Sequence, residues 1–188
     1  MNPGKKSRKI IWGMVIITVI LLTLCGLDIF FRNHISNHSL NRCISNLRVN
    51  VYLCLLYGEE NGGILPDRAD YIKQNSGYMW CLKDTDETVD SYFLIPGLTV
   101  ENSSEMPLMV EKIGNHKEQK SLPVAFVGGN AMSLKKEFRN YSELLPEFSG
   151  ITSEEMKYLH QIFSEWDKGN FTFFPESPFR KDSSQKNH

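Results

Sequence analysis

The feature that most constrains this chain is an apolar segment near its N-terminus. Residues 10–27 contain no charged side chain, and after Asp28 three more apolar residues precede Arg32. A helix rises about 1.5 Å per residue, so about 20 apolar residues cross a bilayer core of about 30 Å. The sequence therefore predicts a transmembrane helix over residues 10–31.

The charges around this segment predict its orientation. Lys5, Lys6, Arg8 and Lys9 precede it, and few basic residues follow it closely. Basic residues favour the cytoplasmic side of a membrane. We therefore predict a basic cytoplasmic tail (residues 1–9), a single pass through the cytoplasmic (inner) membrane, and an extracytoplasmic domain.

An uncleaved signal-anchor has two alternatives, a cleaved secretory signal and a lipoprotein signal. A cleaved secretory signal needs a small-x-small site, and none follows Leu27. A lipoprotein signal would be cleaved before Cys25, but Leu24 stands where a small residue is wanted. The sequence favours the uncleaved anchor and leaves acylation of Cys25 as an alternative.

The composition of the chain predicts a folded domain after the anchor. Hydrophobic residues make up 41% of the chain and charged residues 23%, close to globular averages. The net charge of -1 gives no reason to expect nucleic acid as a partner. We predict one extracytoplasmic domain over residues 32–175 and a disordered polar tail over residues 176–188.

Hydrophobic periodicity predicts the elements of this domain. Apolar residues at three- and four-residue steps predict an amphipathic helix over residues 35–57, ending at residues 61–63: Leu40, Ile44, Leu47, Val51, Cys54 and Leu55. Short apolar runs bounded by Gly, Pro and Asn predict an antiparallel sheet at residues 78–82, 92–95, 107–110, 124–127 and 131–134. Thr152 and Glu155 form a capping-box pattern that predicts a C-terminal helix.

The predicted fold class is therefore α+β. A transmembrane helix continues into a long amphipathic helix, which packs on a small antiparallel sheet, and a helix follows near the C-terminus. A sheet with one apolar face must bury that face, and the apolar stripe of the amphipathic helix is the available partner.

Several segments, in order, resemble the DUF1559-type pseudopilin-like (prepilin-like) envelope proteins. They lie between residues 40 and 134: residues 43–47, 57–66, Cys81, residues 91–99, 107–111, 114–116 and 124–129. The resemblance implies a pilin-like fold and a structural role in an envelope assembly such as type II secretion. It also implies a periplasmic domain.

The chain departs from this family in two places. Gly13 is followed by Met-Val-Ile-Ile and Thr18, where prepilins have a Gly-Phe-x-x-x-Glu cleavage signature. The late His-x9-Asp-Gly motif of the family is also altered, since Gly128 stands in place of its aspartate. Cleavage after Gly13 is therefore left open, and we expect no chemistry from the late motif.

Candidate chemical residues favour structural interpretations. His34 and His38 share a helix face but have no further ligand in sequence, and His116 has the setting of a turn residue. The acidic loop, with Asp84, Asp86, Glu87 and Asp90, lacks calcium-loop spacing. We predict no catalytic, cofactor-binding or metal site, no cofactor and no enzymatic activity.

The cysteines of the domain leave disulfide bonding open. Cys43, Cys54 and Cys81 match no zinc-binding spacing. Cys43 and Cys54 would lie about 16 Å apart along a helix, too far to bond. Either can meet Cys81, so any bridge is expected to include Cys81, and buried thiols are the alternative.

The sequence predicts a non-catalytic, membrane-anchored pseudopilin-like assembly protein. Its expected partners are membrane lipid, and itself or other pilin-like subunits through the hydrophobic helix. The alternative is a membrane-tethered binding module or hydrolase, which would use exposed aromatic rings or His116 with the acidic loop.

Overall fold

A computed structural model describes residues 3–75, 78–81, 84 and 90–180. In the first helix the side chains of residues 3–17, 28–29, 31–33 and 35–36 also lie outside the description. Contacts divide the chain into two compact units, residues 1–38 and 39–188. Each unit is described by itself.

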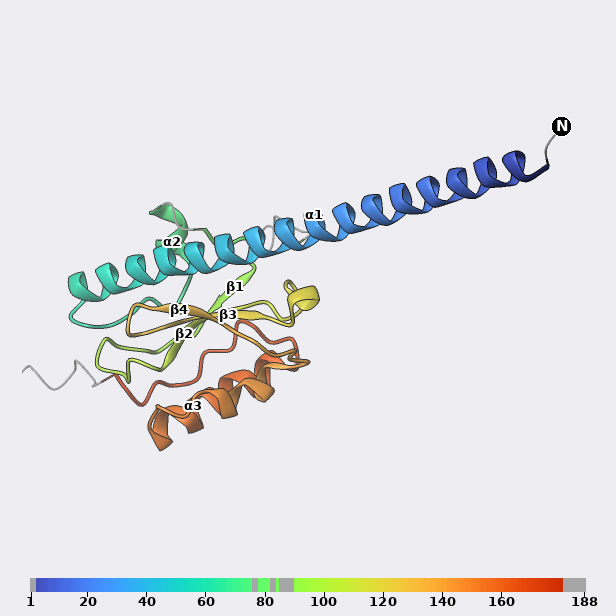
Figure 1. The fold of residues 1–188 in the computed structure, drawn as a ribbon. Helices are drawn as coiled ribbons and strands as arrows, with labels where there is room; N and C mark the ends of the chain where they lie inside the picture. The colour runs from blue at the N-terminus through green and yellow to red at the C-terminus, as the bar shows by residue number, and fades with distance from the viewer. Residues whose placement is uncertain (1–2, 76–77, 82–83, 85–89, 181–188) are drawn as a thin grey trace, which may run out of the picture. The chain divides into compact units, whose positions relative to one another are not determined.

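The first element, α1, is a helix over Pro3–Glu60 (Figure 1). It includes both the apolar segment and the predicted amphipathic segment. In the second unit its buried apolar positions recur every three or four residues: Leu40, Cys43, Leu47, Val51 and Cys54. The helix ends at the predicted stop, where Gly62 (φ 64°) and Gly63 (φ 87°) adopt left-handed conformations.

The described part of the apolar segment exposes its side chains. Val19, Leu22 and Leu24 are 56%, 67% and 58% exposed, respectively. Among the residues that the structure describes, no helix is sufficiently long and apolar to span a membrane. Much of the predicted transmembrane segment, residues 10–31, lies among the side chains outside the description.

Four strands form the predicted small antiparallel sheet, in the order β1-β2-β3-β4 (Figure 1). The strands are Tyr92–Leu94 (β1), Pro107–Glu111 (β2), Leu122–Phe126 (β3) and Ala131–Leu134 (β4). The predicted glycine turn joins β3 to β4, with Gly129 at φ 86°. The α+β class is thus confirmed.

Helices cover both faces of this sheet (Figure 1). On β1, Tyr92 faces α1, and its hydroxyl donates to the Cys43 carbonyl over 3.5 Å. Phe93 faces the opposite way, with its ring centroid 5.6 Å from that of Trp166. Every residue of β2 and β3 is buried, as expected for strands covered on both faces.

Trp166 belongs to α3 (Ser153–Trp166), which begins at the predicted capping box of Thr152 and Glu155. Three short helices were not predicted: α2 (Asp70–Gln74), η1 (Lys117–Gln119) and η2 (Tyr141–Glu147). Each is too short to show a helical period in sequence.

The strand predicted over residues 78–82 is wrong for its described residues. Residues 78–81 are irregular, although Met79 and Cys81 are buried. Side chains from elsewhere in the domain accept hydrogen bonds from two backbone amides of this segment. The Tyr78 amide donates to the Asn50 side chain, and the Cys81 amide donates to the Ser91 hydroxyl. Residues 78–81 therefore contribute buried apolar side chains to the core without forming a strand.

Two described residues of the predicted disordered tail, Ser177 and Arg180, contact the domain. Ser177 donates through its hydroxyl to the carbonyl of Gly97. Arg180 forms an ion pair with Asp67 at 2.6 Å and also donates to the Leu65 carbonyl. Residues up to 180 therefore lie against the domain, and residues 181–188 lie outside the described residues.

Candidate functional site

Four chemically reactive side chains meet inside the second unit. Cys43, Cys81, Glu111 and His116 are all buried, and one ligand atom from each lies within 4.8 Å of the others. We call these four residues the cysteine–histidine cluster.

The cluster draws one residue from each of four segments. Cys43 lies on the buried face of α1, and Cys81 lies in the irregular segment that Ser91 anchors. Glu111 is the last residue of β2, and His116 precedes η1. Gly114, with φ at 104°, allows the turn that brings His116 back to the end of β2.

Short contacts connect the four side chains. The sulfur atoms of Cys43 and Cys81 are 2.8 Å apart. The Cys81 sulfur is 3.4 Å from His116 Nε2, and Nε2 is 3.4 Å from Glu111 Oε1. The histidine thus lies between a sulfur and a carboxylate.

Neighbouring amides orient the cluster. His116 Nδ1 lies 2.8 Å from Gln119 Oε1, so Nδ1 carries the proton that it donates. Asn115 donates to Glu111 Oε1 over 3.2 Å. The other oxygen, Glu111 Oε2, is buried with no hydrogen-bond partner among the described atoms.

The cluster shifts the pKa values of its members. The hydrogen bond from Cys81 outweighs burial and, with a smaller contribution from His116, lowers the pKa of Cys43 to about 4. Burial alone would lower the pKa of His116, but Cys43 and Glu111 raise it to about 10. Burial raises the pKa of Glu111. The thiolate form of Cys43 is therefore favoured.

Cys54 provides a contrast within the same helix. It is fully buried, and burial raises its pKa to about 12, so this thiol stays protonated. Reactivity and metal binding require a thiolate. The environment of Cys43 therefore differs chemically from that of Cys54, although the two face the same core.

Two soft sulfurs, an imidazole and a carboxylate can coordinate a metal ion, and the two sulfurs can alternatively form a disulfide. The side chains of Glu111 and His116 have no solvent exposure. The site is therefore an enclosed one, which suits a bound ion or a covalent bridge better than a substrate.

Among the residues that the structure describes, the other candidate histidines and acidic residues of the sequence do not join this cluster. His34 and His38 are exposed on α1. Asp84 forms an ion pair with Lys112 at 3.2 Å, and Asp90 forms one with Lys73 at 2.8 Å. Asp86 and Glu87 lie outside the described residues.

His116 does occupy a turn, as predicted, but its side chain is fully buried. Glu111 was not singled out in sequence. It carries one weak signal, a carboxylate that directly follows the apolar run of residues 107–110. Cys43 and Cys81 do meet, which agrees with the expectation that Cys81 is the partner of any bridge.

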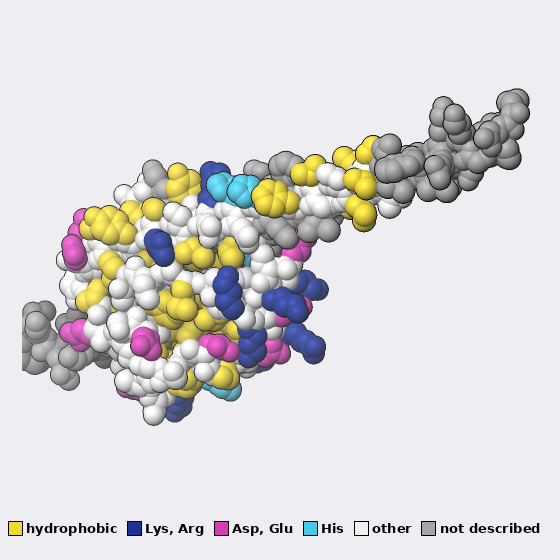
Figure 2. Space-filling view, viewed as in Figure 1, with side chains coloured by type: hydrophobic (Ala, Val, Ile, Leu, Met, Phe, Trp, Pro, Cys, Tyr) yellow, Lys and Arg dark blue, Asp and Glu magenta, His cyan; other side chains and the backbone are white. Residues whose placement is uncertain are grey.

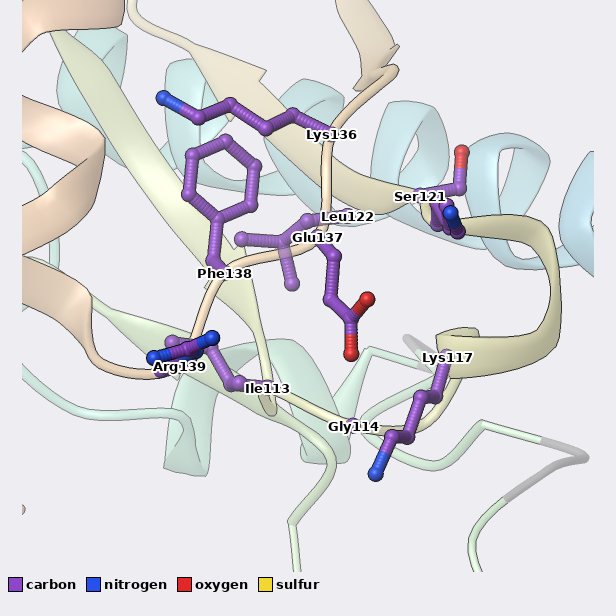
Figure 3. A pocket seen from close by; sticks show the side chains of 10 residues that line it. Ile113, Gly114, Lys117, Ser121, Leu122, Lys136, Glu137, Phe138 and Arg139 are labelled. Carbon is purple, nitrogen blue, oxygen red and sulfur yellow. The ribbon is translucent and has the colours of Figure 1, made fainter.

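A surface pocket of about 220 Å³ lies next to η1 and is rich in basic residues. Its basic lining residues are Lys117, Lys120, Lys136 and Arg139. In Figure 3 the side chains of Lys117, Lys136 and Arg139 extend in different directions instead of converging. Figure 2 shows Lys and Arg side chains gathered on the side of the domain where η1 lies in Figure 1. The pocket provides no focused anion site.

Comparison of the chain with protein-family models, curated proteins and solved structures finds no match.

Proposed function

We propose that this protein is a membrane-anchored, pilin-like structural subunit of a bacterial envelope assembly. The observation that carries this proposal is that two stretches of α1 have different environments, one buried in the domain and one exposed. One stretch of α1 supplies the buried stripe from Leu40 to Cys54 that packs on an antiparallel sheet. An earlier stretch, residues 19–27, is rich in exposed large apolar side chains.

The exposed apolar side chains of residues 19–27 are stabilised when lipid or another protein removes them from water. Each Å² of apolar surface removed from water contributes about 25 cal/mol. Lipid tails and neighbouring apolar helices both remove such surface from water, and the basic cluster of residues 5–9 favours insertion with the N-terminus inside. On this proposal residues 10–31 lie in the inner membrane and the domain lies outside the cytoplasm.

The resemblance to DUF1559-type pseudopilin-like proteins supports the same function. Such a subunit would pack its hydrophobic helix against other copies or other pilin-like subunits within the bilayer. Small residues allow helices to approach closely in membranes, and Gly26 has nothing within 4 Å of the position where a Cβ would stand.

Cys25 offers a direct test. It is exposed on α1, whereas Cys43, Cys54 and Cys81 are buried. Mild oxidation of membranes that contain the native chain should produce a dimer, because neighbouring helices bring two copies of Cys25 together. The matched control is Cys25→Ser, which should remain in the membrane fraction and give no dimer.

The outcomes separate the parts of the proposal. A chain that sediments with membranes but never crosslinks through Cys25 would be a tether without lateral assembly. A chain found in the soluble fraction would remove the anchor itself. Intact mass of the extracted protein then distinguishes an uncleaved N-terminus from cleavage after Gly13 and from acylation at Cys25.

A further inference from the structure

We propose that the cysteine–histidine cluster of Cys43, Cys81, Glu111 and His116 is a structural zinc site. It would hold one Zn²⁺ ion in a closed tetrahedral shell inside the extracytoplasmic domain.

The ligand set has the chemistry that zinc prefers. Zinc binds cysteine sulfur at about 2.3 Å, histidine nitrogen at about 2.0–2.1 Å and carboxylate oxygen at about 2.0–2.2 Å, and structural sites have four ligands. The cluster offers two sulfurs, one nitrogen and one oxygen, all buried. Calcium and magnesium prefer oxygen ligands alone, so the two thiols argue against them.

Two of the six edges between ligand atoms fit a zinc tetrahedron, and all the ligand atoms lie within 4.8 Å of one another. Those bond lengths require edges of about 3.5 Å between sulfur and nitrogen and about 3.4 Å between nitrogen and oxygen. The Cys81–His116 and His116–Glu111 contacts are both 3.4 Å. His116 Nε2 therefore already lies at zinc-ligand spacing from both the Cys81 sulfur and Glu111 Oε1.

The two sulfurs are the exception. A tetrahedral site separates them by about 3.8 Å, whereas they lie 2.8 Å apart. Binding therefore requires the sulfurs to separate by roughly 1 Å, which rotation of the two thiol groups can provide. Because Cys81 lies in an irregular segment, its side chain can adjust without breaking a strand ladder.

Two further observations point to a ligand that carries positive charge. Glu111 Oε2 is buried with no hydrogen-bond partner among the described atoms, and a buried carboxylate is costly unless it is paired or coordinates a metal. His116 donates its Nδ1 proton to Gln119, so Nε2 is the nitrogen that faces the cluster, and a bound zinc ion would take the place of the Nε2 proton. Metal-binding histidines are usually oriented by such a partner.

A disulfide between Cys43 and Cys81 is the competing chemistry. It would consume both sulfurs and release two electrons and two protons to an oxidant such as a disulfide exchange partner. It would leave Glu111 and His116 buried beside it without a role. Zinc uses all four side chains, which is why the structure favours the ion.

The test uses the full chain, extracted in detergent with a thiol reductant and stripped of metal by a chelator. After addition of Zn²⁺ and removal of the excess, elemental analysis should find one zinc per chain. Co²⁺ in place of Zn²⁺ should give the intense thiolate-to-metal charge-transfer band and the visible bands of a tetrahedral site.

Variants assign the site to its residues. Cys43→Ser and Cys81→Ser should lose stoichiometric zinc, whereas the matched control Cys54→Ser should retain it, since Cys54 lies outside the cluster. Because a cluster variant can fail to fold, Gln119→Ala provides a milder test. Removing the partner of Nδ1 should weaken zinc binding about 10- to 100-fold and leave the circular dichroism spectrum unchanged.

Two results would overturn this proposal. One is a folded, reduced chain that binds no zinc and gives no cobalt charge-transfer band. The other is protein from native membranes, alkylated without reduction, in which Cys43 and Cys81 are joined by a disulfide in every molecule. Neither result depends on Cys25 crosslinking, so the zinc site and the assembly role fail or stand separately.

Discussion

At the scale of single residues, Glu155 shows how a buried carboxylate remains ionised. The residue is 2% exposed, and its two carboxylate oxygens accept hydrogen bonds from Asn102, Ser103 and Thr152. Burial opposes ionisation, but these hydrogen bonds outweigh it and lower the pKa from 4.5 to about 2. The ionised form of Glu155 therefore connects the start of α3 to the loop before β2.

This shift predicts a pH dependence of stability. Because the pKa of Glu155 is lower in the folded state than in the unfolded state, its ionised form stabilises the protein at pH values above about 4.5. This contribution is lost as the pH falls from about 4.5 towards 2. Glu155→Gln should reduce the free energy of unfolding by about 1–3 kcal/mol at neutral pH. Urea unfolding at several pH values measures it. A deficit that stays constant from pH 7 to pH 2.5 would contradict this account.

Asn50 is the second buried polar residue with a defined role. Its amide donates to the Tyr78 carbonyl over 2.7 Å and accepts from the Tyr78 amide over 2.9 Å. Asn50→Ala leaves both backbone groups without this partner and should cost about 1–3 kcal/mol in thermal or urea unfolding. Asn41→Ala, at an exposed position of the same helix, should change stability by less than about 0.5 kcal/mol. Equal effects of the two variants would remove the proposed clamp.

At the scale of elements, α3 is held to the sheet by aromatic rings. Trp166 is 2% exposed, and its ring lies 5.3 Å from that of Tyr141 and 5.5 Å from that of Phe163. Phe93 brings β1 into the same group, and Phe171 stacks on it at 4.3 Å. The residues after α3 therefore close over the rings that α3 presents.

Truncation of the central ring should detach α3. Trp166→Ala is expected to destabilise the domain by about 3–5 kcal/mol, because it removes a large buried side chain and leaves a cavity. The control is Tyr52→Ala on α1, where the ring is 61% exposed and little stability should be lost. Thermal unfolding followed by circular dichroism compares them. If both variants melt at the temperature of the parent chain, the aromatic group does not hold α3.

The elements that the sequence predicted are those with a local signal. The turn glycine Gly129, the helix stop at residues 61–63 and the capping box of Thr152 all depend on neighbouring residues, and all are present in the structure. The strand predicted over residues 78–82 is wrong, although the prediction that the segment is buried holds for Met79 and Cys81. The apolar pattern does not show which groups hydrogen-bond to the backbone of this segment. Asn50, far away in sequence, takes the place of a neighbouring strand for Tyr78.

At the scale of the whole molecule, the cysteine–histidine cluster could not be predicted from spacing. Cys43 and Cys81 are 38 residues apart, and Cys81 and His116 are 35 apart, so no local motif joins them. Only the packing of α1 on the sheet, and the turn at Gly114, bring them together. Cys43 belongs to the buried stripe of α1, but the apolar pattern predicted Ile44 at that turn of the helix instead.

The division of the chain into two compact units predicts that residues 39–188 fold without residues 1–38. Among the described side chains, the buried apolar core begins at Leu40 and lies in the second unit, so removal of residues 1–38 takes away none of those core side chains. The new helix start loses the first part of α1 and its terminus frays, which should cost no more than about 2 kcal/mol. The truncated chain should therefore unfold cooperatively in urea, with nearly the slope of the full chain in detergent.

The same truncation separates the two proposals about this protein. It should leave the membrane fraction, since the exposed apolar stretch around Leu22 is gone, and yet bind one zinc per chain, since all four ligands remain. A truncated chain that folds but binds no zinc would reject the zinc site alone. A truncated chain that still sediments with membranes would locate the attachment in the domain and reject the anchor.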